Sequence, residues 1–563
     1  MKFDEFEHVS NIIIYFSLSI IISSITFGIH NKHFGLAVLT ASLFFISVYL
    51  LTNRSFFMVI FIVYILGIFI NYNYYNVNSN EINGVVEVVK EDTKNSIVKQ
   101  NGRKYNINEN FEIGDKLYIK GSLKINKDYE KGIIGDIDII NERKINSNFK
   151  KKLLYLRENI YIKLKENIGQ RKAALISSLA FGYKDKVDDE DIEEMKSLGI
   201  IHAISVSGLH IVLIYTIINM VVSKGISLSI TSIYVIFTGA EFSSIRSLFM
   251  ISILVLSKRF YKNYSSLGAL ALSAMILALI EPYCVFDLGW NLSYGATLGI
   301  ILFREKINKK LYKLPKYIRE NIAISLSAQV FTLPILIRTF NEFSITFLIG
   351  NILVIPILNL IIIIGNSLII GIINMQLFDF ISYILLRIIE GYDFIIDKLD
   401  FLSNSTIYCS NEFIILYGVL LISYYFIKKG FNKFYTLPII SLFFIMISLY
   451  SPFLKINYLK YNGMLVSFEG QRIVMANKIN VDMKELKEKN FANEGYRNGE
   501  KIKINNRIGL ASIGKNFILS IGEKNYILKV NNKIESYSNY DIIDFVEGNI
   551  SGILIIGDYI FTY

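Results

Sequence analysis

The chain has 563 residues, of which 52% are hydrophobic and 19% are charged, and its formal net charge is +11. Soluble domains usually carry about 25% charged residues, so this composition argues against an ordinary soluble protein. The apolar residues gather in long runs. A bilayer core requires about 20 consecutive apolar residues, because backbone polar groups find no water there and must pair within a helix. The sequence therefore predicts a polytopic α-helical membrane protein.

The first three apolar runs predict a three-helix membrane segment over residues 1–72 and comprise Ile12–Ile29, Phe34–Leu51 and Phe56–Tyr72. Three acidic residues precede the first run, no small-residue cleavage site follows it, and a second run comes at once. We therefore interpret the first run as a span and not as a cleavable signal peptide.

Residues 73–148 are polar and alternate in the manner of β-strands, in Gly84–Val89, Lys116–Ile125 and Gly132–Ile140. Asn101-Gly102 between two further strand-like segments is a hairpin signal. About five short strands predict a small β-barrel, and an oligonucleotide-binding (OB) barrel is one candidate. Four aromatic residues either stack on bases or belong to the barrel core: Tyr105, Phe111, Tyr118 and Tyr129.

Residues 149–182 are assigned to juxtamembrane helices. Within Phe149–Ile168, Lys and Arg interleave with Leu and Ile, which predicts a basic amphipathic helix. Such a helix either lies on the membrane surface or links two domains.

Residues 183–451 are assigned to a transmembrane channel domain. Its apolar runs bring the expected number of spans to about eleven. They are Ile200–Val222, Ser244–Ser257, Leu267–Ile280, Leu288–Phe303, Ile322–Ile337, Ile345–Ile373, Phe413–Ile427 and Phe434–Tyr450. Ile345–Ile373 is interrupted at Pro356, and we interpret it as two short spans. Residues 452–563 are polar again and predict a β-rich C-terminal domain.

Basic loops orient the spans. Arg304–Arg319 holds the densest group of Lys and Arg, and positively charged loops remain in the cytoplasm. Counting spans outward from this loop places Lys258-Arg259 and Lys428-Lys429 inside as well. The Glu281–Cys284 turn and both β domains then lie outside. The sequence thus predicts a multi-pass plasma-membrane protein with extracellular β domains, provided that the 345–373 run crosses twice.

Polar residues within apolar runs are the informative ones, because lipid makes them costly. They form four clusters. The first holds His202, Ser205, Ser207, Gly208 and His210, the second is Arg246, and the third holds Asp287 and Asn291. The fourth holds Gln329, Arg338 and Asn351, together with Pro334 and Pro356, and these two prolines mark broken helices. The first cluster either lines a wet path or supports helix packing. Arg246 either pairs with Glu241 or faces phosphate.

The four clusters, in this order and spacing, resemble the competence region of the ComEC family. Ser177–Lys186 provides a small-residue helix and a charged turn before Ser207-Gly-Leu-His210. A Ser-x-x-Arg turn ends at Arg246, an Asp-x-Gly-x-x-x-Ser helix begins at Asp287, and an Asn-x-x-x-x-Pro segment begins at Asn351. The resemblance covers about residues 170–430.

This resemblance implies a channel that passes single-stranded DNA across the plasma membrane in natural transformation. The polar residues of the four clusters would line the path. The resemblance implies as partners the lipid bilayer, a surface DNA receptor or pilus, and a cytosolic helicase or translocase. It does not imply an oligomeric state. Three alternatives stay open: a channel or transporter for another solute, an intramembrane enzyme using His202 and His210, and an inactive homologue.

Many longer members of the family carry a metallo-β-lactamase-like nuclease domain, whose metal site needs several histidines. This chain has five histidines, His8, His30, His33, His202 and His210, and its two cysteines are Cys284 and Cys409. No histidine follows position 210, so the sequence predicts no metal site, no cofactor and no nuclease activity. It also lacks a Walker loop, so energy for transport would come from a partner.

Overall fold

The computed structural model describes residues 8–77, 79–91, 95–145, 149–204, 207–399, 406–428, 430–459, 463–476, 482–497, 499–504, 508–513, 516–530, 540–545, 550–557 and 559–563. Ser205, one of the predicted path residues, lies outside these ranges. The chain divides into two compact units. The first comprises Met1–Ile335 and Ser344–Ser405, and the second comprises Leu336–Phe343 and Thr406–Tyr563. Each unit is described by itself.

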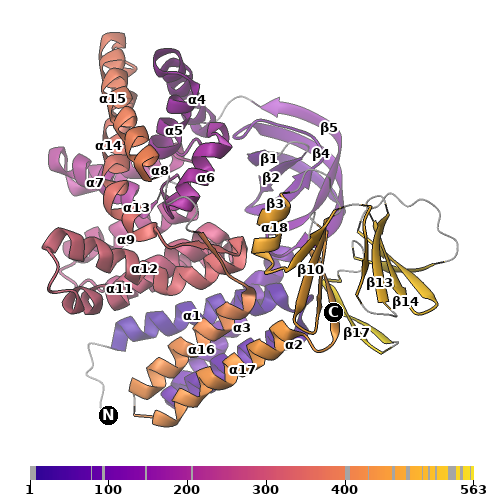
Figure 1. Ribbon diagram of the computed structural model, residues 1–563. Coiled ribbons are helices and arrows are strands. Elements are labelled where there is room, and N and C mark those ends of the chain that lie inside the picture. The colour runs from indigo at the N-terminus through magenta and orange to yellow at the C-terminus, as the bar shows by residue number, and fades with distance from the viewer. Residues whose placement is uncertain are drawn as a thin grey trace. The chain divides into compact units, whose positions relative to one another are not determined.

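The first unit opens with three apolar helices, α1 (His8–Ile29), α2 (Phe34–Leu51) and α3 (Arg54–Tyr75), as predicted (Figure 1). Small polar residues hold α1 against α3. Ser19 Oγ donates to Ile60 O over 3.0 Å, and Asn71 Nδ2 donates to Ser24 Oγ over 3.0 Å. Small side chains let two apolar helices approach closely, and interhelical hydrogen bonds then stabilise the pair.

A closed five-stranded barrel follows, formed by β1 (Glu81–Glu91), β2 (Ser96–Gln100), β3 (Arg103–Ile107), β4 (Lys116–Asp128) and β5 (Ile133–Ile145). The strand order around the barrel is β1-β2-β3-β5-β4. The predicted hairpin turn joins β2 to β3: Gln100 pairs with Arg103, and Asn101 and Gly102 have φ of 49° and 82°. Positive φ at both central residues gives the turn the twist that a tight hairpin needs.

Only Tyr118 of the four predicted stacking residues presents its ring to solvent, at 45% exposure. Tyr105 is buried in the barrel core, and Phe111 and Tyr129 pack against that core. Strand alternation places Tyr105 on the inward face of β3, whereas Phe111 and Tyr129 reach the core from loops, because burying an aromatic ring is strongly favourable.

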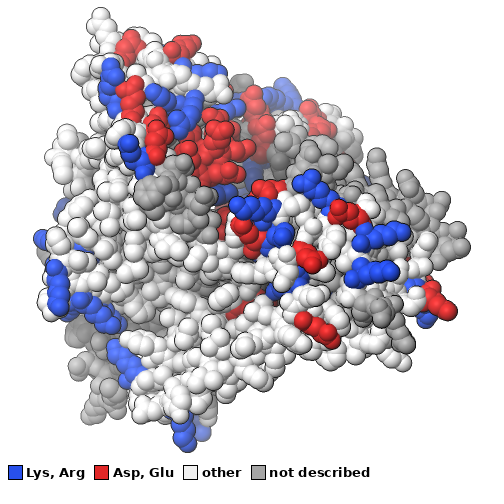
Figure 2. Space-filling view, in the orientation of Figure 1, with Lys and Arg blue, Asp and Glu red and all other residues white. Residues whose placement is uncertain are grey.

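Three helices connect the barrel to the apolar helices that follow: α4 (Phe149–Ile168), α5 (Gln170–Phe181) and α6 (Asp189–Ser197). α4 spans the predicted amphipathic segment, and its buried residues Ile160, Tyr161 and Leu164 face protein. α5 is buried from Ala173 to Phe181. α6 is acidic, with Asp189, Glu190 and Glu193 exposed, and Figure 2 shows acidic side chains gathered there.

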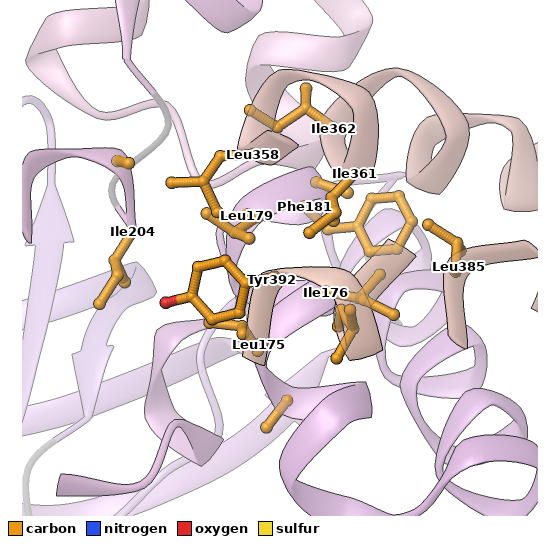
Figure 3. Packing of buried hydrophobic residues seen from close by; sticks show 14 of the residues in the cluster. Leu175, Ile176, Leu179, Phe181, Ile204, Leu358, Ile361, Ile362, Leu385 and Tyr392 are labelled. Atoms are coloured by element: carbon orange, nitrogen blue, oxygen red, sulfur yellow. The ribbon is translucent and has the colours of Figure 1, made fainter. Parts of the chain in front are cut away.

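Among the described residues, nine further helices follow in this unit. They are α7 (Gly208–Val221), α8 (Lys224–Phe237), α9 (Phe242–Arg259), α10 (Ser266–Ile280), α11 (Leu288–Lys310), α12 (Lys316–Phe340), α13 (Phe347–Leu353), α14 (Ile355–Gly371) and α15 (Met375–Leu399). Of these, α7, α8, α9, α14 and α15 contribute buried residues to the largest hydrophobic core of the unit. In Figure 3 the side chain of Leu179 from α5 lies between Leu358 of α14 and Tyr392 of α15, and Leu175 of α5 lies on the other side of the Tyr392 ring. The core thus joins segments from both ends of the unit.

Among the described residues, five helices are long and apolar enough to cross a membrane, or six if one bent pair counts as a span. This is fewer than the predicted number. The run Ile200–Val222 is divided between the 3₁₀ turn η2 (Ile201–Ala203) and the shorter helix α7. α13 and α14 form the bent pair, with an angle of 45° beside Pro356, because proline removes a helical hydrogen bond. α7, α8 and α10 are apolar but shorter.

The second unit begins with an apolar helical hairpin, α16 (Asn411–Lys428) and α17 (Thr436–Tyr450), joined by η5 (Asn432–Tyr435). Two sheets follow, with orders β11-β10-β9-β8-β17-β18 and β12-β13-β14-β15-β16. They share one core that includes Ile456, Val466, Phe517 and Leu528, so the predicted β-rich character is confirmed. The strands are β8 (Leu454–Leu459), β9 (Gly463–Phe468), β10 (Gln471–Ala476), β11 (Glu494–Tyr496), β12 (Lys501–Lys503), β13 (Ile508–Ile513), β14 (Asn516–Ile521), β15 (Lys524–Lys529), β16 (Asp541–Asp544), β17 (Gly552–Ile556) and β18 (Tyr559–Thr562), with helix α18 (Met483–Lys489) after β10.

Candidate anion-binding site at a buried arginine

The site begins at the N-terminus of α7, where Ser207 is the capping residue. Ser207 N donates to His210 Nδ1 over 2.7 Å, and Ser207 Oγ accepts from Leu209 N over 3.3 Å. His210 therefore reaches back to the cap as a glutamate does in a capping box. Because Nδ1 accepts this bond, the imidazole proton is on Nε2, and that buried atom has no partner among the described residues.

Gly208, the first residue of α7, lies directly against α9. A Cβ at this position would lie 2.5 Å from Arg246 Nη2 and 2.5 Å from Ser247 Oγ. No real side chain tolerates such distances, so the guanidinium occupies space that only a glycine leaves open. The predicted Ser-Gly-Leu-His motif and Arg246 are thus parts of one site.

Arg246 is 8% exposed, and its guanidinium is held by neutral groups. Nε donates to Ser293 Oγ of α11 over 2.8 Å, Nη2 donates to Ser247 Oγ over 3.2 Å, and Nη1 lies 3.5 Å from Met250 Sδ. The guanidinium carbon also lies 5.9 Å from the centre of the Tyr294 ring. The cation thus joins α9 to α11 at the point where α7 begins.

Within the part of the chain that the structure describes, no carboxylate lies within 4 Å of Arg246. Of the two alternatives for Arg246, pairing with Glu241 does not occur: Glu241 Oε1 accepts from Lys184 Nζ over 2.5 Å. A buried charge costs several kcal/mol unless it is paired, and a polar cation in an apolar helical region marks a functional site. The arrangement has the charge and the donors to bind an anion.

The two predicted residues of the third cluster cap α11. Asp287 Oδ1 accepts from Trp290 N over 2.9 Å, and Asn291 Nδ2 donates to Val285 O over 2.9 Å. Their side chains are thus committed to the helix end, and they lie near the site without contacting Arg246. The contact to Arg246 comes from Ser293. The Asp-x-Gly-x-x-x-Ser spacing ends on this serine, which was the available signal for it.

The other predicted path residues are more scattered. His202 is exposed in η2. Gln329 Oε1 accepts from Thr332 Oγ1 over 3.1 Å within α12, and Asn351 Nδ2 of α13 donates to Ser325 Oγ of α12 over 3.0 Å. Arg338 is exposed and belongs to the second unit. Pro334 lies inside α12 and Pro356 lies in the first turn of α14.

The barrel is attached to the turn that precedes α11. In η3 (Pro282–Phe286), the Tyr283 side chain enters the barrel core, and a Cβ on Gly132 would lie 2.2 Å from its ring. Glu281 accepts from Lys99 Nζ of β2 over 2.6 Å and from Tyr283 Oη over 2.6 Å. Burial opposes ionisation of Glu281, but these two bonds outweigh it, so its pKa lies below the ordinary value.

The same turn covers part of β3. Lys104 Nζ lies 4.0 Å from the centre of the Tyr283 ring. Burial lowers the pKa of Lys104, although attraction to Glu281 opposes the shift. The barrel and the α10–α11 turn therefore lie side by side; that they share one side of the membrane stays a prediction.

Residues 179–431 match a family model described as Competence protein. A curated relative, ComE operon protein 3 of Bacillus subtilis (strain 168), is 29% identical over 219 residues. The aligned region covers 37% of this chain and 28% of that protein, so the chain matches less than a third of its relative's length. No solved structure matches the chain. The two matches support the predicted resemblance to the ComEC family, and the Arg246 site lies inside the matched segment.

Proposed function

We propose that this chain is a ComEC-family competence protein that passes a DNA strand across the plasma membrane during DNA uptake. The matches over residues 179–431 support a competence role. The observation that carries the proposal for the site is the buried Arg246 guanidinium, which has no carboxylate partner among the described residues and is surrounded by hydroxyl groups. Guanidinium groups bind phosphate through charge-assisted hydrogen bonds.

The proposed role of Arg246 is a phosphate contact near the barrel end of the helices. Ser247, Ser293 and Met250 offer neutral acceptors, which the guanidinium exchanges for phosphate oxygens at little electrostatic cost. As the strand moves, Arg246 contacts its phosphates one after another. A single contact of moderate strength suits transport, because a substrate must bind well enough to enter and weakly enough to leave.

The barrel has the strand order expected of an OB barrel, and we propose that identity for it. OB barrels bind oligonucleotides mainly on the face of strands 2 and 3. Here Lys99 on β2 and Lys104 on β3 contact the α10–α11 turn. We therefore propose that this face fixes the barrel above the Arg246 site, and that any DNA contact of the barrel uses another face, such as the one that exposes Tyr118.

We further propose that the chain has no nuclease activity and uses no metal. The second unit contains no histidine, and histidine-rich ligand sets supply the metal-bound hydroxide in metallo-β-lactamase-like nucleases. Extracellular placement of both β domains, a surface receptor or pilus, and a cytosolic translocase belong to the same proposal.

The test is entry of labelled double-stranded DNA into the cytoplasm of cells that lack the gene and are complemented with variants. Arg246→Gln should abolish entry while DNA still binds outside the cell, and Arg246→Lys should restore part of it. Arg259→Gln is the matched control, because Arg259 lies exposed at the far end of the same helix. It should transport DNA as the parent does. Membrane levels of each variant are measured in parallel.

Unchanged DNA entry after deletion of the gene would end the proposal. In that case, uptake of labelled anionic solutes into the same strains distinguishes a transporter for another solute from an inactive homologue. Equal loss in the Arg246→Gln and Arg259→Gln strains would show that net positive charge, and not the buried site, determines uptake.

A further inference from the structure

The second unit contains a cavity that the proposed DNA path does not use. It is an open pocket with a volume of about 310 Å³ where α16 begins, α17 ends and β10 starts. Its lining residues are Ser410, Phe413, Leu449, Tyr450, Gly470, Arg472, Phe491 and Asn493. All of them lie in the second unit, so the cavity is a property of that unit alone.

Two polar atoms in this lining are buried and have no hydrogen-bond partner among the described residues: Arg472 Nε and Ser410 Oγ. Arg472 forms no ion pair within 4 Å in the described part of the chain, although Glu412 lies near enough to attract it. Burial lowers the pKa of the Arg472 guanidinium. An arginine Nε and a hydroxyl without partners in one cavity are two donors that an anionic acceptor would satisfy.

The wall of the cavity is rigidly built. Gly470 N donates to Tyr450 O over 2.6 Å, and Glu469 N donates to Ser451 O over 2.9 Å, which attaches the β9–β10 turn to the end of α17. On the other side, Asn493 N donates to Arg472 O over 2.7 Å. The backbone of Arg472 is therefore fixed from two directions while its side chain faces the cavity.

The position of the cavity points to a lipid. Residues 436–450 of α17 include no buried residue, and Asn432–Tyr450 is apolar enough to cross a membrane. Figure 2 shows the surface over α16 and α17 nearly free of charge along its length. The cavity lies at the end of this hairpin where α16 begins and α17 ends, so a membrane crossed by α17 would have its lipid headgroups at this level. Tyrosines such as Tyr450 are typical of that level.

We propose that this cavity binds the phosphate of an anionic phospholipid, with Arg472 and Ser410 as its donors. The glycerol then lies beside Asn493, and an acyl chain extends along the exposed side chain of Phe413 and the half-buried side chain of Leu449. The cavity is of the size that small-ligand sites have. Binding of this lipid would hold the β sheets at the membrane surface beside the α16–α17 hairpin. This inference does not depend on DNA transport.

The test uses the full chain purified in detergent and analysed by native mass spectrometry with added lipid. The parent protein should retain phosphatidylglycerol in preference to phosphatidylcholine. Arg472→Gln should weaken phosphatidylglycerol binding about tenfold or more, which is the usual effect of losing a buried charge-assisted hydrogen bond. Ser410→Asp should weaken it similarly by placing a carboxylate beside the guanidinium. Arg497→Gln, which removes an exposed arginine of the same unit outside the cavity, should bind as the parent does.

Arg472→Lys keeps the positive charge, so it should retain most of the lipid binding. It is the control for folding, because binding by Arg472→Lys shows that a substitution at this position leaves the unit folded. Equal lipid binding by the parent and a folded Arg472→Gln protein would overturn the proposal. So would competition by millimolar inorganic phosphate that removes the lipid preference, since the ligand would then be a soluble anion. Arg472-dependent capture of a single-stranded oligonucleotide in place of lipid would equally reject it.

Discussion

Replacing Gly208 with alanine tests the geometry of the Arg246 site without removing any of its polar groups. The new Cβ would lie 2.5 Å from Arg246 Nη2, whereas the next atom of that side chain, Cζ, is 3.7 Å away. The guanidinium must therefore move by more than half an ångström, because real contacts of a Cβ essentially never fall below 3.0 Å. Ser247 Oγ, also at 2.5 Å, must move as well.

The energy at stake follows from two hydrogen bonds. Arg246 donates to Ser247 over 3.2 Å and to Ser293 over 2.8 Å, and a hydrogen bond to a charged group contributes about 1.5–3 kcal/mol. Alanine gains about 0.5–1 kcal/mol over glycine in a helix. Loss of one bond thus leaves a net cost of about 1–2 kcal/mol. A cost of about 1.4 kcal/mol reduces the population with a correctly placed guanidinium roughly tenfold.

DNA entry into the cytoplasm should accordingly fall about tenfold in the Gly208→Ala strain. Gly225→Ala is the control, because Gly225 lies in the first turn of α8 and a Cβ there meets nothing within 4 Å. That variant should transport DNA at the parent rate and be equally or slightly more stable. Normal uptake by Gly208→Ala at normal membrane levels would refute the argument that guanidinium placement limits transport.

Three further predictions concern the first unit. Trp290, the only tryptophan of the chain, packs 4.5 Å from Tyr294 beside Arg246, so a single-stranded oligonucleotide should change its fluorescence in the parent protein and leave that of Arg246→Gln unchanged. A double-mutant cycle on Lys99→Ala and Glu281→Ala should give a coupling of about 1 kcal/mol in thermal unfolding, and zero coupling would show that the ion pair does not hold the barrel. Asp115 is 3% exposed and bonds to Lys151 at 2.5 Å and to Lys144 at 2.7 Å. Asp115→Asn should therefore lower the free energy of unfolding by about 2 kcal/mol. Asp138→Asn, which removes one partner of an exposed pair, should change it by about 0.5 kcal/mol or less. Burial opposes ionisation of Asp115, but the two lysines outweigh it and lower its pKa. The contribution of Asp115 to stability should therefore be complete above about pH 4 and disappear as the pH falls further. A stability difference between the parent and Asp115→Asn that stays the same at acid pH would contradict this.

Local patterns in the sequence predicted local structure well. The Asn101-Gly102 pair predicted a tight hairpin, and the structure places a two-residue turn there, because positive φ is a property of those two residues themselves. The amphipathic pattern of Phe149–Ile168 likewise predicted α4. What that pattern could not decide was the partner of the apolar face, which is the protein core and not lipid alone.

Span prediction was less successful, because hydropathy measures composition and not continuity. The run Ile200–Val222 is mostly apolar, yet it contains a 3₁₀ turn and a capped helix start at Ser207. Ser207 and His210 satisfy the backbone groups that this break exposes, which is the condition for irregular backbone among apolar helices. The same residues that were predicted to line a path therefore first have to build the helix end.

The contents of the Arg246 site depended on contacts that no local pattern reports. Arg246 and Ser293 are 47 residues apart, and their bond exists because α9 and α11 cross where α7 begins. Sequence reasoning selected Asp287 and Asn291 because a charge and an amide stand out in an apolar run, but polar residues at a helix start are the ordinary choice for caps. Ser293 did not stand out, since one serine in a helix usually bonds to its own backbone. The better guide was the cation itself, because a buried guanidinium must find acceptors. The described residues supply it with only hydroxyls and a thioether, and under the proposed function a phosphate of the DNA is the anion that completes the site.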